Sequence, residues 1–272
     1  MIIDRSKVID TFKAYTSHYD DQNEKVRLKI EHTYRVSELC EKIAQSLNLS
    51  PEDVNIAWLL GMLHDVGRFE QLRLYNTYLD AQSIDHAMYG ADILFGSENH
   101  STDHHNVAAH DRGLIRTYID SDVEDALLEA AIRYHSLYRL PENLDSRTKT
   151  FCQILRDADK IDILKVNVDY SLEEVLDLKS AKIKTETVSE DVMNAFFEGH
   201  AVLHSLKKTS ADHIVGYISL FFELVYPESR RITISQGYID QLLTYPSDNP
   251  KTREQFELLR QKIDSFNQEH RS

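Results

Sequence analysis

Glycine and proline are scarce in this chain, with 8 and 5 residues among 272. So few residues that break regular structure favour long helices over a sheet with many turns. Cysteine is scarcer still: Cys40 and Cys152 are too few for a disulfide-stabilised scaffold and fit a reducing compartment. No apolar run reaches the roughly 18 residues that a membrane-spanning helix needs, and the charged N-terminal stretch is unlike a signal peptide. We therefore expect a cytoplasmic protein with no membrane partner.

Basic residues are outnumbered, with 31 Lys and Arg against 45 Asp and Glu and a formal net charge of -14. Proteins that bind a phosphate backbone normally present a basic surface, so we expect no nucleic acid as the main partner. A small anionic substrate is compatible with this charge, because a metal ion in a cleft supplies positive charge locally. The length allows a large core and at most two domains.

Apolar residues recur every three or four positions from Val26 to Leu47, which predicts an amphipathic helix. Ser50 and Pro51 predict the cap and first turn of a second, very apolar helix, and Gly67 is predicted to end it. Further expected elements are helices at 83–96, 121–136, 147–165, 188–206, 211–225 and 250–268, a short strand at 231–235, and a polar, histidine-rich loop at 97–113. The simplest interpretation is an all-α protein.

His64 and Asp65 stand side by side at the end of that apolar helix. An imidazole and a carboxylate are costly to bury unless something pairs with them, and a divalent cation would do so. A single adjacent His and Asp more often form a structural hydrogen bond. Here, however, two further candidate ligands are present: His32 in a helix upstream and Asp159 after an apolar stretch downstream. Two imidazoles and two carboxylates suit Mn, Fe, Zn, Co or Ni. The set is too nitrogen-rich for a site dedicated to Ca or Mg, although Mg remains a possible occupant.

Three segments together resemble the HD superfamily of metal-dependent phosphohydrolases: His32-Thr33-Tyr34-Arg35-Val36, Leu63-His64-Asp65-Val66-Gly67-Arg68 and Asp157-Ala158-Asp159-Lys160. The resemblance covers residues 20–165. It implies an HD-domain helical bundle there, with a helical extension at 166–272 that either packs on it or continues the same domain. It also implies that His32, His64, Asp65 and Asp159 are metal ligands. The implied activity is hydrolysis of a phosphomonoester or phosphodiester, often of a nucleotide, by a metal-activated water.

His86 and His135 resemble the further ligands of two-metal members of the superfamily, in which the aspartate of the doublet bridges two ions. The chain departs from the cyclic-dinucleotide phosphodiesterases, because Ser136 follows His135 and no Gly-Tyr-Pro occurs. The two histidines are therefore predicted either to ligate a second metal, or to line the pocket, or to have a structural role. One or two ions remain open.

Asp65 and three basic residues are given roles in addition to metal ligation. Asp65 is predicted to orient the nucleophile as well as to ligate, while Arg68 and Lys160 are predicted to neutralise charge on the phosphoryl oxygens. Arg35 fits a structural ion pair at least as well as a phosphate contact. A second doublet, His110-Asp111, follows a polar loop and is not expected to ligate.

Two alternatives to hydrolysis stay open. The first is a di-iron oxygenase on the same fold, which His86 and His135 would serve. The second is a non-catalytic module that binds a nucleotide and regulates a partner. The expected partner is a small molecule, and for hydrolysis or regulation it is phosphorylated, with a nucleotide as the expected class. The oligomeric state is open, a homo-oligomer included.

Overall fold

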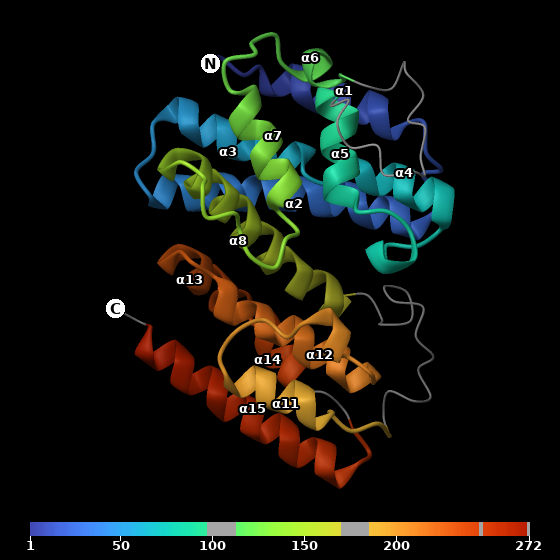
Figure 1. Ribbon diagram of the computed structural model, residues 1–272, viewed down its shortest axis with the longest axis vertical. Helices are drawn as coiled ribbons and strands as arrows, with labels where there is room; N and C mark the ends of the chain where they lie inside the picture. The colour runs from blue at the N-terminus through green and yellow to red at the C-terminus, as the bar shows by residue number, and fades with distance from the viewer. Residues whose placement is uncertain (97–112, 170–184, 245–246, 271–272) are drawn as a thin grey trace. The chain divides into compact units, whose positions relative to one another are not determined.

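A computed structural model describes residues 1–96, 113–169, 185–244 and 247–270 of the chain. Within these ranges the regular structure is helical, with no strand, which confirms the all-α class (Figure 1). The predicted polar loop, including His110 and Asp111, lies outside the described residues except for Gly113. The chain divides into two compact units, Met1–Ala158 and Asp159–Ser272, and each is described by itself. No described helix combines the length and the apolar character needed to cross a membrane.

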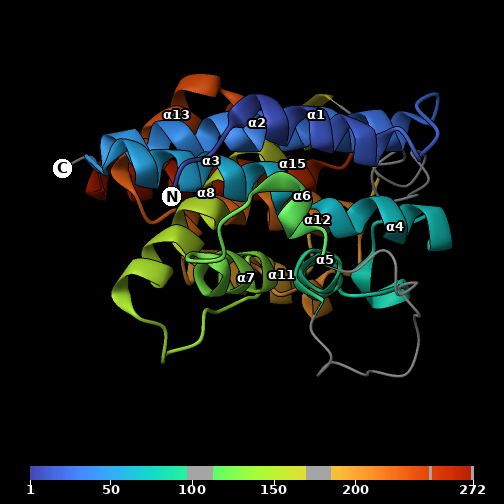
Figure 2. The same cartoon turned by 90° about the horizontal axis from the view of Figure 1, so that it is seen from above.

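The first unit contains a bundle of helices and one short 3-10 turn. In chain order these are α1 (Arg5–Thr16), α2 (Glu24–Ser46), α3 (Pro51–Leu63), α4 (Val66–Tyr75), η1 (Asp80–Gln82), α5 (His86–Phe95), α6 (Ile115–Tyr118), α7 (Asp125–Tyr134) and α8 (Ser146–Asp169) up to Ala158. Helices α2 and α3 run side by side in both Figure 1 and Figure 2. Helix α5 packs against both α4 and α7.

The two helices predicted most sharply are present with their expected signals. Asn23 caps α2 by accepting from the backbone N–H of Lys25. Ser50 caps α3 by accepting from the backbone N–H of Asp53, with Pro51 in the first turn, as predicted. Because α3 is apolar all round, its residues from Ile56 to Leu63 are buried and the helix forms the centre of the core.

The prediction that Gly67 ends this helix is wrong. Helix α3 ends at Leu63, and Gly67 lies inside α4, the next helix. A Cβ atom on Gly67 would lie 2.3 Å from the backbone oxygen of His86 and 2.7 Å from the backbone nitrogen of Gly90. The glycine is therefore required for the close approach of α4 and α5, which the local sequence cannot reveal.

The second unit is also helical. Beyond the rest of α8 it contains α11 (Glu190–Phe197), η3 (His204–Leu206), α12 (Ser210–Ile218), η4 (Ser219–Glu223), α13 (Pro227–Gln236), α14 (Tyr238–Leu243) and α15 (Pro250–Glu269). Helix α15 contacts both α11 and α14, and α12 contacts α11 and α14. The helix predicted at 188–206 is shorter than expected, because Gly199 adopts a φ of 80° soon after α11 ends.

The strand predicted at 231–235 is wrong, because these residues belong to α13. Pro227 occupies the first turn of this helix and Gly237, with a φ of 70°, ends it. Ser229, Ile232 and Thr233 are buried, a spacing of three and four that fits a helix. Five residues of alternation were too few to distinguish this pattern from a strand.

Candidate metal centre

The junction between α3 and α4 presents the His-Asp doublet to the core. His64 is the C-terminal cap of α3, and Asp65 is the N-terminal cap of α4. Asp65 has φ -107° and ψ 16°, so the backbone leaves the helical conformation there, and α4 begins at the next residue. His64 is fully buried and Asp65 is 3% exposed. Two ionisable side chains are therefore held inside the core, as predicted, and require partners there.

Four imidazoles surround the Asp65 carboxylate, and its two oxygens face different pairs of them. Oδ2 lies 3.4 Å from His32 Nε2 and 3.5 Å from His64 Nε2. Oδ1 lies 3.5 Å from His86 Nε2 and 3.8 Å from His135 Nε2. The structure thus brings together five of the six predicted ligands, all in the first unit. The arrangement is that of a carboxylate placed between two sites.

The other ring nitrogen of three histidines is held by the protein. His64 Nδ1 donates to the backbone oxygen of Gly61 at 2.8 Å, and His135 Nδ1 donates to that of Ile132 at 2.7 Å. His86 Nδ1 donates to Asp80 Oδ2 at 2.7 Å. A carbonyl or carboxylate oxygen accepts here, so Nδ1 carries a proton, and in the neutral form of the ring the lone pair lies at Nε2. Such a fixed tautomer, with Nε2 turned inward, is what a metal ligand requires.

Within each pair, these inward nitrogens face one another. His32 and His64 have Nε2 atoms 3.3 Å apart, and those of His86 and His135 are 3.1 Å apart. His86 and His135 are both held through Nδ1, so their Nε2 lone pairs repel at this separation unless a proton or a metal cation lies between them. For metal–nitrogen bonds of about 2.1 Å these separations correspond to angles of about 104° and 95°, within the range of tetrahedral and octahedral coordination. The residues therefore fit a divalent transition-metal ion on each side of Asp65.

Charge at the centre is arranged for ligation at neutral pH. Burial tends to raise the pKa of Asp65, but Lys29, His64, His32 and Arg68 outweigh it and hold that pKa well below its usual range. Burial and then the charge of Arg68 lower the pKa of His86 to about 4, against the opposing pull of Asp80 and Asp65. Asp65 is thus ionised and His86 neutral, the forms in which each binds a metal.

Three residues of the centre were not predicted. Lys29 Nζ lies 2.6 Å from Asp65 Oδ2, and its position one helical turn before His32 on α2 is a signal that could have found it. Asp80 holds His86, and Tyr78 lies beneath Lys29 with the ammonium 5.3 Å from the ring centroid. The last two come from the segment between α4 and α5, which carries no spacing that predicts such contacts.

Arg68 has a defined place beside the doublet. Its Nη1 donates to Asp80 Oδ1, to Gln71 Oε1 and to the backbone oxygen of Tyr78, each at 2.7 Å. Its Nε lies 3.6 Å from Asp65 Oδ1 and is buried with no hydrogen-bond partner among the described residues. The guanidinium therefore anchors Asp80, and through it His86. Its predicted contact with phosphate stays a prediction.

Close packing keeps the histidine-bearing helices in register. A Cβ on Gly61 of α3 would lie 2.4 Å from Ser37 Cα on α2, so this glycine allows His64 to come within reach of His32. At the end of α7, Arg156 donates through Nη1 to the backbone oxygens of Tyr134 and His135, both at 3.1 Å. These bonds satisfy carbonyls at the helix end and hold His135 in place.

The remaining predicted residues lie on two helices. Arg35 on α2 forms an ion pair with Glu31, 3.5 Å between Nη1 and Oε2, in agreement with the structural alternative. Asp159 and Lys160 follow Ala158 directly on α8, at the start of the second unit, and both are half-buried. Their roles as ligand and phosphate-binding residue stay predictions.

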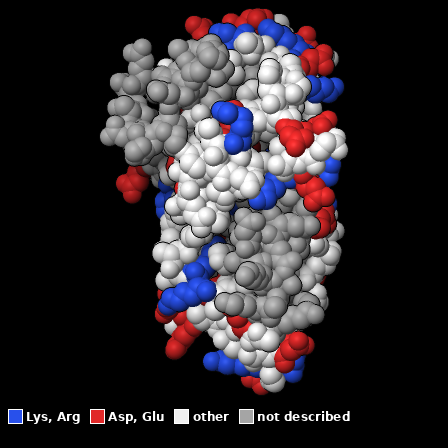
Figure 3. Space-filling view, turned by 90° about the vertical axis from the view of Figure 1, so that its right-hand side faces the viewer, with Lys and Arg blue, Asp and Glu red and all other residues white. Residues whose placement is uncertain are grey.

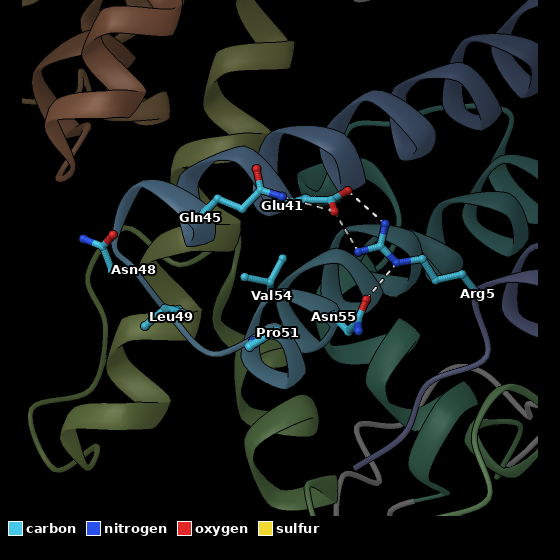
Figure 4. A pocket seen from close by; sticks show the side chains of 8 residues that line it. All are labelled: Arg5, Glu41, Gln45, Asn48, Leu49, Pro51, Val54 and Asn55. Atoms are coloured by element: carbon cyan, nitrogen blue, oxygen red, sulfur yellow. Dashed lines mark hydrogen bonds and ion pairs between the residues drawn. The ribbon is translucent and has the colours of Figure 1, made fainter.

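A surface groove of about 560 Å³ lies elsewhere in the first unit (Figure 4). Arg5 crosses it, paired at 2.9 Å with both oxygens of Glu41 and bonded at 2.8 Å to Asn55. Glu41 is nine residues beyond His32 on α2, about 13 Å along the helix axis. The charged groups of the groove thus neutralise one another, and none of the histidines around Asp65 lines it.

A family model of the HD domain matches residues 30–164, which contain all six predicted metal ligands. Residues 30–164 therefore form an HD domain. Proteins of this family are mostly metal-dependent hydrolases, and the buried His/Asp groups of this chain fit a divalent metal ion. No curated protein and no solved structure matches the chain.

Proposed function

We propose that this protein is a metal-dependent phosphohydrolase that cleaves a phosphate ester, with a nucleotide-like substrate as the expected class. The observation that carries the proposal is the placement of four imidazole nitrogens on the two oxygens of Asp65. A divalent ion bound there supplies an acidified water as nucleophile and polarises a phosphoryl oxygen.

The proposed ligands divide between two positions. His32, His64, Asp65 and Asp159 hold the first ion, with the role of Asp159 taken from the motif Asp-Ala-Asp-Lys. His86 and His135 hold a second ion on the other oxygen of Asp65. Asp65, whose two oxygens face neighbouring imidazole nitrogens, would orient the attacking water as well as ligate.

The chain's own residues supply the rest of the chemistry. Asp80 keeps the Nδ1 proton on His86, so that His86 Nε2 remains a base rather than a donor. Lys160, beside the proposed ligand Asp159, is placed to meet developing charge on the phosphoryl oxygens. On the face drawn in Figure 3, acidic and basic side chains are interspersed rather than gathered by sign. The positive charge that attracts a phosphate is therefore proposed to come from the metal site itself.

One observation favours a second candidate. Four histidines around one bridging carboxylate also suit a di-iron centre that activates oxygen. Uptake of dioxygen by the iron-loaded protein, without release of phosphate from any ester, would select this function over hydrolysis.

The experiment is a reconstitution. The protein is stripped by chelation, reloaded anaerobically with Mn, Fe, Zn, Co or Ni, and assayed for phosphate release from nucleoside monophosphates and from cyclic and linear phosphodiesters. We expect turnover only with metal, and its loss by at least about 100-fold in His64→Ala. His18→Ala, at an exposed histidine after α1, is the matched control and should retain full turnover. Equal turnover of stripped and reloaded protein would contradict the proposal.

A further inference from the structure

Lys29 brings a buried ammonium to the metal centre. It lies on α2 three residues before His32 and therefore on the same face, one turn earlier. Its Nζ is 2.6 Å from Asp65 Oδ2, the oxygen that His32 and His64 also face, and its side chain is only 14% exposed. Its partners among the described residues are this carboxylate and the Tyr78 ring.

We propose that Lys29 binds the phosphate of the substrate and makes the site selective for a phosphomonoester dianion over a phosphodiester. This inference rests on the proposed function, because it names the ester that the same site accepts. The oxygen bonded to Lys29 is the one that the first ion would take. Once that oxygen is ligated it carries less negative charge, so the ammonium, with three N–H donors, can bind a further anion at the same place.

The balance of charge around Asp65 supports a dianion. Lys29 and Arg68 flank Asp65, and Asp80 pairs with Arg68, so these four charges cancel before any ion binds. A divalent ion held with Asp159 leaves the site positive, and a second ion makes it more so. A phosphomonoester carries about two negative charges at neutral pH, whereas a diester carries one. With both proposed ions bound, the site carries more positive charge than a diester can balance, so the monoester neutralises it better.

Arg68 cannot serve this purpose as readily. Its Nη1 already makes three bonds, each 2.7 Å long, to Asp80, Gln71 and Tyr78. Binding a phosphate with Nη1 would break contacts that hold His86. Lys29 has no such commitment beyond Asp65 and Tyr78, and its flexible stem allows Nζ to follow an incoming anion.

The test compares Lys29→Met with wild type, both loaded with metal. Lys25→Met is the matched control, since Lys25 lies one turn earlier on α2 and donates to the backbone oxygen of Asn76. Metal content is measured first and should be the same in all three. Inorganic phosphate is then titrated by calorimetry, and we expect its affinity to fall about tenfold or more in Lys29→Met, the loss of one charge-assisted contact, and less than about twofold in Lys25→Met.

Turnover gives the second readout. The ratio of kcat/KM for p-nitrophenyl phosphate to that for bis(p-nitrophenyl) phosphate should fall about tenfold in Lys29→Met. An equal loss for both esters, an unchanged phosphate affinity, or loss of metal from Lys29→Met would each overturn the inference. If the wild type cleaves neither these esters nor any substrate of the reconstitution assay, the proposed function fails. The phosphate titration still decides on Lys29, and a wild type that does not bind phosphate overturns its role.

Discussion

His86 and His135 meet at the centre of the first unit, with their Nε2 atoms 3.1 Å apart and both facing Oδ1 of Asp65. They come from α5 and α7, two helices separated by a long stretch of chain, yet each ring is fixed through Nδ1. A purely structural role for the two histidines would not require both Nε2 atoms to face the same carboxylate oxygen. This placement is the observation behind the proposed second ligand site that shares Asp65 with the first.

The second site leads to a prediction about stoichiometry. His135→Ala should reduce the bound transition metal from two ions to one per chain, since the His32–His64 side of Asp65 is left intact. His64→Ala should likewise remove the ion on the first side, because His32 is then the one histidine left beside Oδ2 of Asp65. Elemental analysis of anaerobically purified protein measures both. A content that is the same in His135→Ala as in wild type would refute the second site.

Asp80 is predicted to act through His86. In Asp80→Asn the amide group still fills the space, but it no longer presents a charged acceptor to His86 Nδ1 at 2.7 Å. Such outer contacts to a ligating histidine typically contribute about 10- to 100-fold in metal affinity, so we expect weakening of that size at the second site alone. Competition with a fluorescent chelator measures the affinity. Unaltered binding of both ions would show that Asp80 has no influence on the ligand.

Gly67→Ala tests the close approach of α4 and α5. The new methyl group would lie 2.3 Å from the backbone oxygen of His86, so the two helices must move apart. We expect a loss of about 1–3 kcal/mol in the free energy of unfolding, together with weaker metal binding at His86. Denaturant unfolding of the metal-free protein measures the first effect.

Gly216→Ala is the control for that substitution. On α12 the atoms nearest to a new Cβ belong to the end of the Lys207 side chain, which can swing away. Its free energy of unfolding should therefore change little. If both variants lose the same stability, the effect is one of helical glycine in general and not of the α4–α5 contact.

The helices were predicted more fully than the centre they build. The spacing of apolar residues gave α2, and the Ser50-Pro51 pair gave the start of α3, because both are local signals. The His64-Asp65 doublet was also legible, since an acid beside an imidazole in so apolar a helix requires an explanation. What the sequence could not show was the meeting of α5 and α7, which depends on packing between distant segments.

Residues that act through non-local contacts were missed or misread. Gly67 was taken for a helix end because its contact with His86 is between helices. Asp80 reaches His86 across a turn whose shape has no fixed sequence signature. Lys29, by contrast, stands at helical spacing from His32 and could have been recognised by the rule that linked Arg35 to the same ligand.

Protonation of His213, a half-buried histidine in the second unit, should limit stability in acid. Burial, then Lys207 and His204, lower the pKa of His213 to about 4 in the folded protein, against an ordinary value near 6.5. Between these values the unfolded chain binds a proton that the folded state does not, so the free energy of unfolding falls as the pH drops from about 6.5 toward 4.

His213→Gln should make this decline shallower, because the substitution removes the group that takes up the proton. Thermal unfolding of metal-free protein across this pH range measures the slope. His18→Gln, at an exposed position, should leave the slope as in wild type. A decline that is equally steep without His213 would assign it to other groups.

Metal content in Asp65→Ala tests the central claim most directly. Asp65 is the carboxylate that faces all four histidines, so its loss should remove both ions while the fold, checked by circular dichroism, remains. Asp10→Ala, at an exposed aspartate of α1, is measured beside it and should bind as wild type does. The prediction is one or two equivalents of a transition metal in wild type and Asp10→Ala and none in Asp65→Ala. Equal metal in all three proteins, or none in wild type after reloading with Mn, Fe, Zn, Co or Ni, would contradict a metal centre built on Asp65.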